Sequence, residues 1–134
     1  MAPETNGGSA GGLAAATVRY LDLRMRLADA GRYQITPRAE DALATLALSR
    51  QILAHVAGDR GPTILDALRG GASWPQIGEA MGLTVHQARV LLEQWIADQV
   101  RLFQAHEGRC GMSPAAAAAA RRRADQAPGG GELR

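Results

Sequence analysis

The chain has 134 residues, which is enough for one domain with a modest core, and its formal net charge of +2 indicates no particular partner. Ala and Leu supply most of the 46% hydrophobic content, which favours helices over strands. The single cysteine, Cys110, excludes an internal disulfide, and the sequence shows neither a membrane-spanning apolar run nor a secretory signal. We therefore expect a cytoplasmic, helical protein without a bound cofactor.

The N-terminal third predicts one helix after a loose start. Residues 1–12 are rich in Gly and contain almost nothing to bury, so we expect them to be flexible. A helix is predicted over 13–30, because apolar residues recur there at steps of three and four. A second apolar stripe lies beside the first and comprises Val18, Leu21 and Met25. So wide an apolar face has to be covered from two sides, by the rest of the domain or by a second subunit.

Two further helices are predicted before residue 72. Thr36 is a candidate N-cap and Pro37 suits a first helical position, so a helix is expected from there to Gly58. Pro62 then predicts the start of a separate short helix, which ends at the glycine pair 70–71. No segment shows the alternating pattern of a strand. The sequence therefore predicts an all-α fold of about five helices, the last two of which follow residue 72.

Two helix starts lie eleven residues apart in the stretch SWPQIGEAMGLTVHQARVLLEQW. Ser73 and Thr84 are each followed three residues later by a glutamine, the spacing of a capping box. Gly82 lies between them, where a left-handed residue would end the first helix. We therefore predict a helix over 74–81, a short turn, and a second helix from 85 to about 106.

Residues 61–95 resemble the helix-turn-helix of bacterial DNA-binding regulators. This range includes the helices predicted over 74–81 and from 85, and the short helix predicted before them. The closest likeness is to small actinobacterial regulators and to the last region of sigma-70-type factors. The resemblance depends on the apolar residues of both helices and on the turn, namely Ile77, Met81, Gly82, Leu83, Val85, Ala88 and Leu91. Gly78 departs from the family, which usually has Ala there, although Gly also permits the close helix approach required at that position.

The resemblance implies that the helix from residue 85 enters the major groove of DNA. If Ala88, Leu92 and Trp95 face inward, the helical period turns other side chains outward. The predicted DNA-binding residues are Thr84, His86, Gln87, Arg89, Val90 and Gln94. Arginine suits guanine, glutamine suits adenine, valine can touch a thymine methyl, and Thr84 can contact a phosphate. Possible backbone contacts are Ser73, Trp74, Arg121, Arg122 and Arg123.

The local charge favours a weaker DNA reader or a different partner. Residues 61–107 contain three arginines and five acidic residues, whereas phosphate contacts normally supply much of the affinity for DNA. We therefore expect a homodimer on two half-sites, with the helices of residues 13–57 and the end of the long helix as its core and dimer contact. The alternative is a protein-interaction module on a helix-turn-helix scaffold, which would bind a polymerase subunit or another regulator.

The remaining sequence predicts no chemistry. Residues 108–134 combine an alanine run with three consecutive arginines and are expected to be a flexible tail, while residues 13–107 form the helical domain. Ser113 and Pro114 could start a helix within the tail, but it would be marginal because we see no apolar face with which it could pack. The three histidines, His55, His86 and His106, lack the spacing of metal ligands. No arrangement of nucleophile and base is present, so we expect no metal site and no enzymatic activity.

Overall fold

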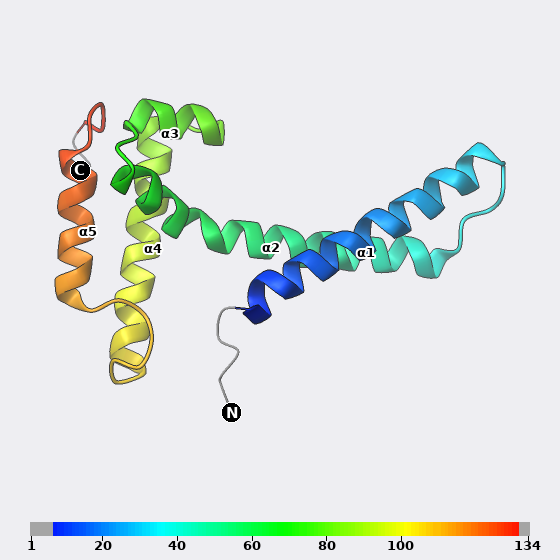
Figure 1. Cartoon of the computed structure of the whole chain (residues 1–134), viewed down its shortest axis with the longest axis horizontal. Coiled ribbons are helices and arrows are strands. Elements are labelled where there is room, and N and C mark those ends of the chain that lie inside the picture. Colours follow the sequence, from blue (N-terminus) through cyan, green and yellow to red (C-terminus); the bar gives the residue numbers. More distant parts are fainter. Residues whose placement is uncertain (1–6, 132–134) are drawn as a thin grey trace. The chain divides into compact units, whose positions relative to one another are not determined.

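The structure, a computed structural model, describes residues 7–131, and this part of the chain is all-α, as predicted (Figure 1). It contains five helices and no strand: α1 (Gly7–Arg32), α2 (Ala39–Arg69), α3 (Trp74–Met81), α4 (Val85–Ala105) and α5 (Pro114–Gln126). The chain divides into two compact units at Gly58, inside α2. The first unit contains α1 and most of α2, and the second contains the end of α2 with α3, α4 and α5.

Helix α1 begins earlier than the sequence predicted. Residues 7–12 were expected to be flexible, yet they form the first turns of a helix that starts at Gly7. Adding a residue to an existing helix avoids the cost of nucleation, so the strong helical pattern downstream extends backward through this Gly-rich segment. The expected flexibility of residues 1–6 lies outside the described residues.

Helix α2 is one helix where two were predicted. It begins at Ala39 rather than at Pro37, and it continues through Gly58, Gly61 and Pro62 to Arg69. Proline removes one backbone hydrogen bond, but packing can compensate for that loss. Such packing is present, because a Cβ at Gly61 would collide with the indole of Trp95 on α4. The absence of a side chain at Gly61 therefore lets α2 approach α4 closely beside the proline.

The core of the second unit collects apolar side chains from all four of its helices. Its largest fully buried members are Trp74, Leu92 and Ile96. The remaining buried members are Ile64, Leu65, Leu68, Ile77, Ala88, Ala117, Ala120 and Ala124. Burying each large aliphatic side chain contributes roughly 1.5–3 kcal/mol, so this cluster is the main source of stability in the unit.

Helix α5 lies beside α4 and differs from the expected flexible tail (Figure 1). Ser113 caps its start by accepting a hydrogen bond from the Ala116 backbone N–H at 3.1 Å. Ala117, Ala120 and Ala124 recur at steps of three and four and are buried, so they form an apolar face. This face was missed because a stripe of alanines does not stand out within a run of alanines.

The first unit buries far less. Within its described side chains, only Ala16, Leu23 and Thr45 are buried. Large apolar residues of both helices are exposed instead. No helix in the part of the chain that the structure describes is both long enough and apolar enough to cross a bilayer.

Candidate nucleic-acid interface

Both predicted capping boxes are present. The Ser73 hydroxyl accepts from the Gln76 backbone N–H at 3.3 Å, and the Gln76 side chain accepts from the Ser73 N–H at 2.9 Å. Thr84 and Gln87 make the same reciprocal pair at 3.1 and 2.9 Å. These bonds satisfy N–H groups that a helix start leaves unpaired, so each helix begins at a defined residue.

The turn between α3 and α4 is tight and depends on two glycines. Gly82 has a φ of 68°, in the left-handed region that glycine adopts without steric cost. A Cβ at Gly78 would lie 2.8 Å from the Leu83 carbonyl oxygen, closer than real contacts allow. The absence of a side chain at Gly78 thus lets α3 approach the turn that leads into α4.

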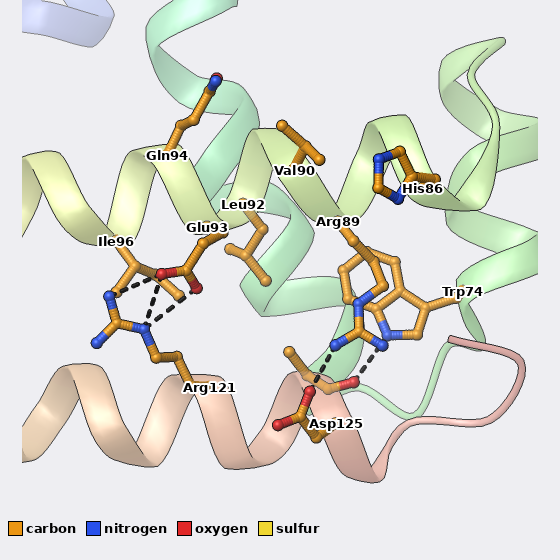
Figure 2. A pocket seen from close by; sticks show the side chains of 11 residues that line it. Trp74, His86, Arg89, Val90, Leu92, Glu93, Gln94, Ile96, Arg121 and Asp125 are labelled. Carbon is orange, nitrogen blue, oxygen red and sulfur yellow. Dashed lines mark hydrogen bonds and ion pairs between the residues drawn. The ribbon is translucent and has the colours of Figure 1, made fainter. Parts of the chain in front are cut away.

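Three of the predicted DNA-binding residues form a row along α4. His86, Val90 and Gln94 are four residues apart, a spacing that places them on one side of a helix. His86 and Gln94 are exposed and Val90 is half-buried. Figure 2 shows Val90 and Gln94 on the side of α4 that points away from α5. We call these three residues the reading row.

Thr84 and Gln87 are exposed, but their side chains are committed to the cap. The Gln87 amide oxygen accepts the Thr84 N–H, and the Thr84 hydroxyl accepts the Gln87 N–H. A glutamine that pairs with adenine uses both its oxygen and its amino group. The Gln87 oxygen therefore already has one partner, whereas no hydrogen bond involves the Gln94 amide within residues 7–131.

Arg89 lies away from the exposed face, although the sequence placed it among the DNA-binding residues. Its side chain is 4% exposed and faces α5. One nitrogen donates to the Asp125 carboxylate at 2.5 Å (Figure 2). Another donates to the Gly131 carbonyl at 2.6 Å. The guanidinium also lies 5.4 Å from the centre of the Trp74 ring, within the range of a cation–π contact. Arg89 thus joins α4 to the C-terminal segment.

Trp74, like Arg89, is buried, so its side chain is not available to a phosphate backbone. Its side chain is fully buried, and its indole N–H donates to the Ala124 carbonyl at 2.8 Å. Its backbone N–H donates to the Pro128 carbonyl at 3.0 Å. The C-terminal segment therefore covers the start of α3. Ser73, the neighbouring candidate contact, is half-buried and uses its hydroxyl in the cap.

The three consecutive arginines are divided between two roles. Arg121 pairs with Glu93 of α4 at 2.8 Å (Figure 2). This hydrogen bond raises the pKa of the Arg121 guanidinium above its ordinary value, an effect that partial burial opposes and the charge of Glu93 reinforces. Arg122 and Arg123 are exposed on α5 and have no ion pair within residues 7–131. Only these two remain available to a DNA backbone.

Sequence reasoning missed one basic residue beside the reading row. Arg60 belongs to α2 but lines the same shallow groove as His86, Gln87, Val90 and Gln94. It is exposed and has no ion-pair partner among the described residues. No local motif marks it, because its position depends on α2 continuing past Gly58, where the sequence predicted the end of a helix. Arg60 supplies a positive charge next to the reading row, which contains no arginine or lysine.

A second groove, of about 540 Å³, runs between α4 and α5 (Figure 2). It is lined by the two ion pairs, Arg89–Asp125 and Arg121–Glu93, which hold the helices together. Its charged groups are thus engaged with one another. Among the residues that the structure describes, no three His, Cys, Asp or Glu side chains are grouped as metal ligands would be.

Comparison with protein families, with curated proteins and with solved structures finds no match to this chain.

Proposed function

We propose that the protein is a sequence-specific DNA-binding transcriptional regulator. The observation that carries this proposal is the row of the exposed His86 and Gln94, with the half-buried Val90 between them, on the helix that follows the tight turn at Gly82. In DNA-binding helix-turn-helix units, the N-terminal residues of the second helix contact base edges in the major groove. Gln94 can pair with adenine, and Val90 can touch a thymine methyl.

Phosphate contacts would come from three exposed arginines. Arg60 lies beside the reading row, and Arg122 and Arg123 lie on α5. Each arginine that neutralises one phosphate makes the affinity fall more steeply with salt, by about one unit of the logarithmic slope. So few free cations indicate that a single copy binds DNA weakly. Two copies on two half-sites would provide the affinity that one copy lacks.

A second candidate function is a protein-interaction module built on the same scaffold. The observation that favours it is that most arginines in the described part of the second unit pair with acidic residues of the same unit. Five of its eight described arginines are in ion pairs with Asp or Glu, and Arg89 is buried as well. A surface with so little free positive charge is unusual for a DNA reader.

A DNA-binding experiment with the full chain distinguishes the DNA-binding regulator from the protein-interaction module. We expect the protein to select particular fragments from genomic DNA at about 50 mM salt and to release them as salt rises. Gln94→Ala should change the selected sequence and weaken binding by about 1–3 kcal/mol, because it removes a base contact. Arg60→Gln should weaken binding to all fragments and lower the salt slope by about one.

Two matched variants control this experiment. Gln104→Ala changes the same residue type on the same helix, about 15 Å farther from the turn, and should leave the preference unchanged. Arg109→Gln removes an exposed arginine that is paired with Glu107 and should leave the salt slope unchanged. Folded protein that retains no DNA at low salt would exclude the regulator and favour the interaction module.

A further inference from the structure

The first unit exposes an apolar surface that its own fold does not cover. Val18, Leu21 and Met25 on α1 are between 56% and 68% exposed. On α2, Leu43, Leu46 and Leu53 are between 64% and 68% exposed. So many large apolar side chains clustered on one small unit mark an interaction site.

The exposed residues follow the spacing of a coiled-coil seam on each helix. On α1 the seam consists of Ala14, Val18, Leu21, Met25 and Ala28, which are separated by steps of four and three. On α2 the seam consists of Leu43, Leu46, Arg50, Leu53 and Ala57, which are separated by steps of three and four. All ten residues are exposed. Strict alternation of these steps is the period with which one helix packs along another.

Each helix therefore has a buried side and a separate exposed seam. At about 100° per residue, the α1 seam lies roughly opposite the buried Ala16 and Leu23. The α2 seam lies about a third of a turn from the buried Thr45. Leu48 and Ile52 are half-buried on the same side of α2 as Thr45, so that side is apolar as well. A helix with two apolar sides packs between two neighbours, as in a four-helix bundle. The described part of the first unit, residues 7–58, has only two helices, so a four-helix bundle requires two more.

The two seams match each other in length and in position. Each spans about 21 Å along its helix. The central residue of the α1 seam, Leu21, lies eleven residues before the helix end at Arg32. The central residue of the α2 seam, Arg50, lies eleven residues after the helix start at Ala39. Both centres thus lie equally far along their helices from the connection between α1 and α2, and a two-fold axis can bring each α1 seam against the α2 seam of a second copy.

The one polar residue in the seams determines which helices pair. If two α2 seams packed together, Arg50 would face the same arginine of the other copy, and like charges in contact are unfavourable. If an α2 seam packs on an α1 seam, Arg50 faces Leu21 and the neighbouring Asp22. The Asp22 carboxylate is exposed, 3.1 Å from Arg26 of its own helix, and can accept a second cation.

We propose that the first unit is a dimerisation module in which the α1 seam of one copy packs on the α2 seam of a second copy. By symmetry the contact occurs twice and completes a four-helix bundle. The Asp22 carboxylate pairs with Arg50 across each of the two contacts. This inference goes beyond the proposed DNA binding and does not depend on it, because it is tested without DNA.

A charge exchange in the full chain tests the pairing directly. Arg50→Glu places two acids together at both contacts, and Asp22→Arg places two arginines together at both. Each variant alone should dimerise at least about tenfold more weakly than the unchanged chain. In an equimolar mixture, one copy of each variant gives an opposite-charge pair at both contacts. Light scattering after size exclusion should then show a mass of twice 14.1 kDa for the mixture.

A second pair of variants tests the apolar part of the contact. Leu46→Glu places a charge within the α2 seam and should weaken dimerisation about a hundredfold. Gln51→Glu introduces the same charge at an exposed position outside the seam and should leave dimerisation unchanged. Circular dichroism shows whether each variant keeps its helices. The proposal is overturned if the unchanged chain is a folded monomer at micromolar concentration, if Leu46→Glu and Gln51→Glu dimerise equally, or if the charge mixture gives no dimer.

Discussion

The two units of the chain use similar residues in opposite ways. In the second unit, Leu92 is 1% exposed and belongs to a core that collects side chains from four helices. In the first unit, Leu53 is 68% exposed on the same kind of helix. The comparison teaches that a helical pattern determines where the apolar side lies, while the number of neighbouring helices determines whether that side is covered. The second unit completes its core within one chain, whereas the first leaves its apolar seams exposed, which is why we propose that a second copy covers them.

The largest effect on stability is expected for Trp74→Ala. Trp74 is fully buried, and its indole N–H binds the Ala124 carbonyl, so this change opens a cavity and leaves a carbonyl unpaired. We expect the second unit to lose about 3–5 kcal/mol of unfolding free energy, measured with urea. Leu53→Ala in the first unit is the matched comparison and should barely alter the unfolding of the second unit. Equal losses at Trp74 and Leu53 would contradict the division into a packed unit and an uncovered one.

The next prediction compares the unfolding free energies of two variants of α2, with one substituted glycine on each side of the boundary between the units. A Cβ at Gly61 would collide with Trp95, so Gly61→Ala should lower the unfolding free energy by about 1–3 kcal/mol. Gly58 has nothing within 4 Å, so Gly58→Ala should raise it by about 0.5–1 kcal/mol through helix propensity alone. The two variants therefore shift the thermal midpoint in opposite directions. A stabilising Gly61→Ala would show that α2 does not approach α4 there.

An effect of similar size is expected at Arg89, where a structural role and a role in DNA binding can be distinguished. Arg89→Met keeps a long side chain but loses the bonds to Asp125 and Gly131. We expect a loss of about 1–3 kcal/mol in unfolding free energy, because Arg89 is buried while Asp125 can turn to water. The selected DNA sequence should stay the same, in contrast to Gln94→Ala. A changed sequence preference would return Arg89 to the reading face.

The sequence predicted the features that depend on local chemistry. The two capping boxes, the glycine turn and the bounds of α3 and α4 follow from residues within three or four positions of one another. Such contacts form wherever the helix forms, so pattern alone identifies them. The outward direction of His86, Val90 and Gln94 also followed from the helical period.

Apart from the early start of α1, the features that sequence reasoning missed depend on contacts between distant segments. Pro62 was predicted to start a helix, but it lies inside α2, where Gly61 packs closely against Trp95 of α4. The alanine face of α5 is visible only when α4 lies beside it. Arg89 was expected in the DNA groove because its partner, Asp125, lies 36 residues away in a segment that was predicted to be flexible. Arg60 was missed because a helix was expected to end at Gly58, whereas α2 continues and places Arg60 beside residues of α4 that are far from it in the sequence.

Hydroxyl-radical footprinting on a selected DNA fragment tests the central claim most directly, because it reports both units at once. If the first unit joins two copies and the second unit presents the reading row, two protected patches should appear. Their centres should lie about 10 base pairs, or a whole multiple of one helical turn, apart. In Leu46→Glu, which keeps the reading row but lacks the seam, protection should be lost at the same protein concentration. A single protected patch for the unchanged chain, or equal protection by Leu46→Glu, would contradict the account.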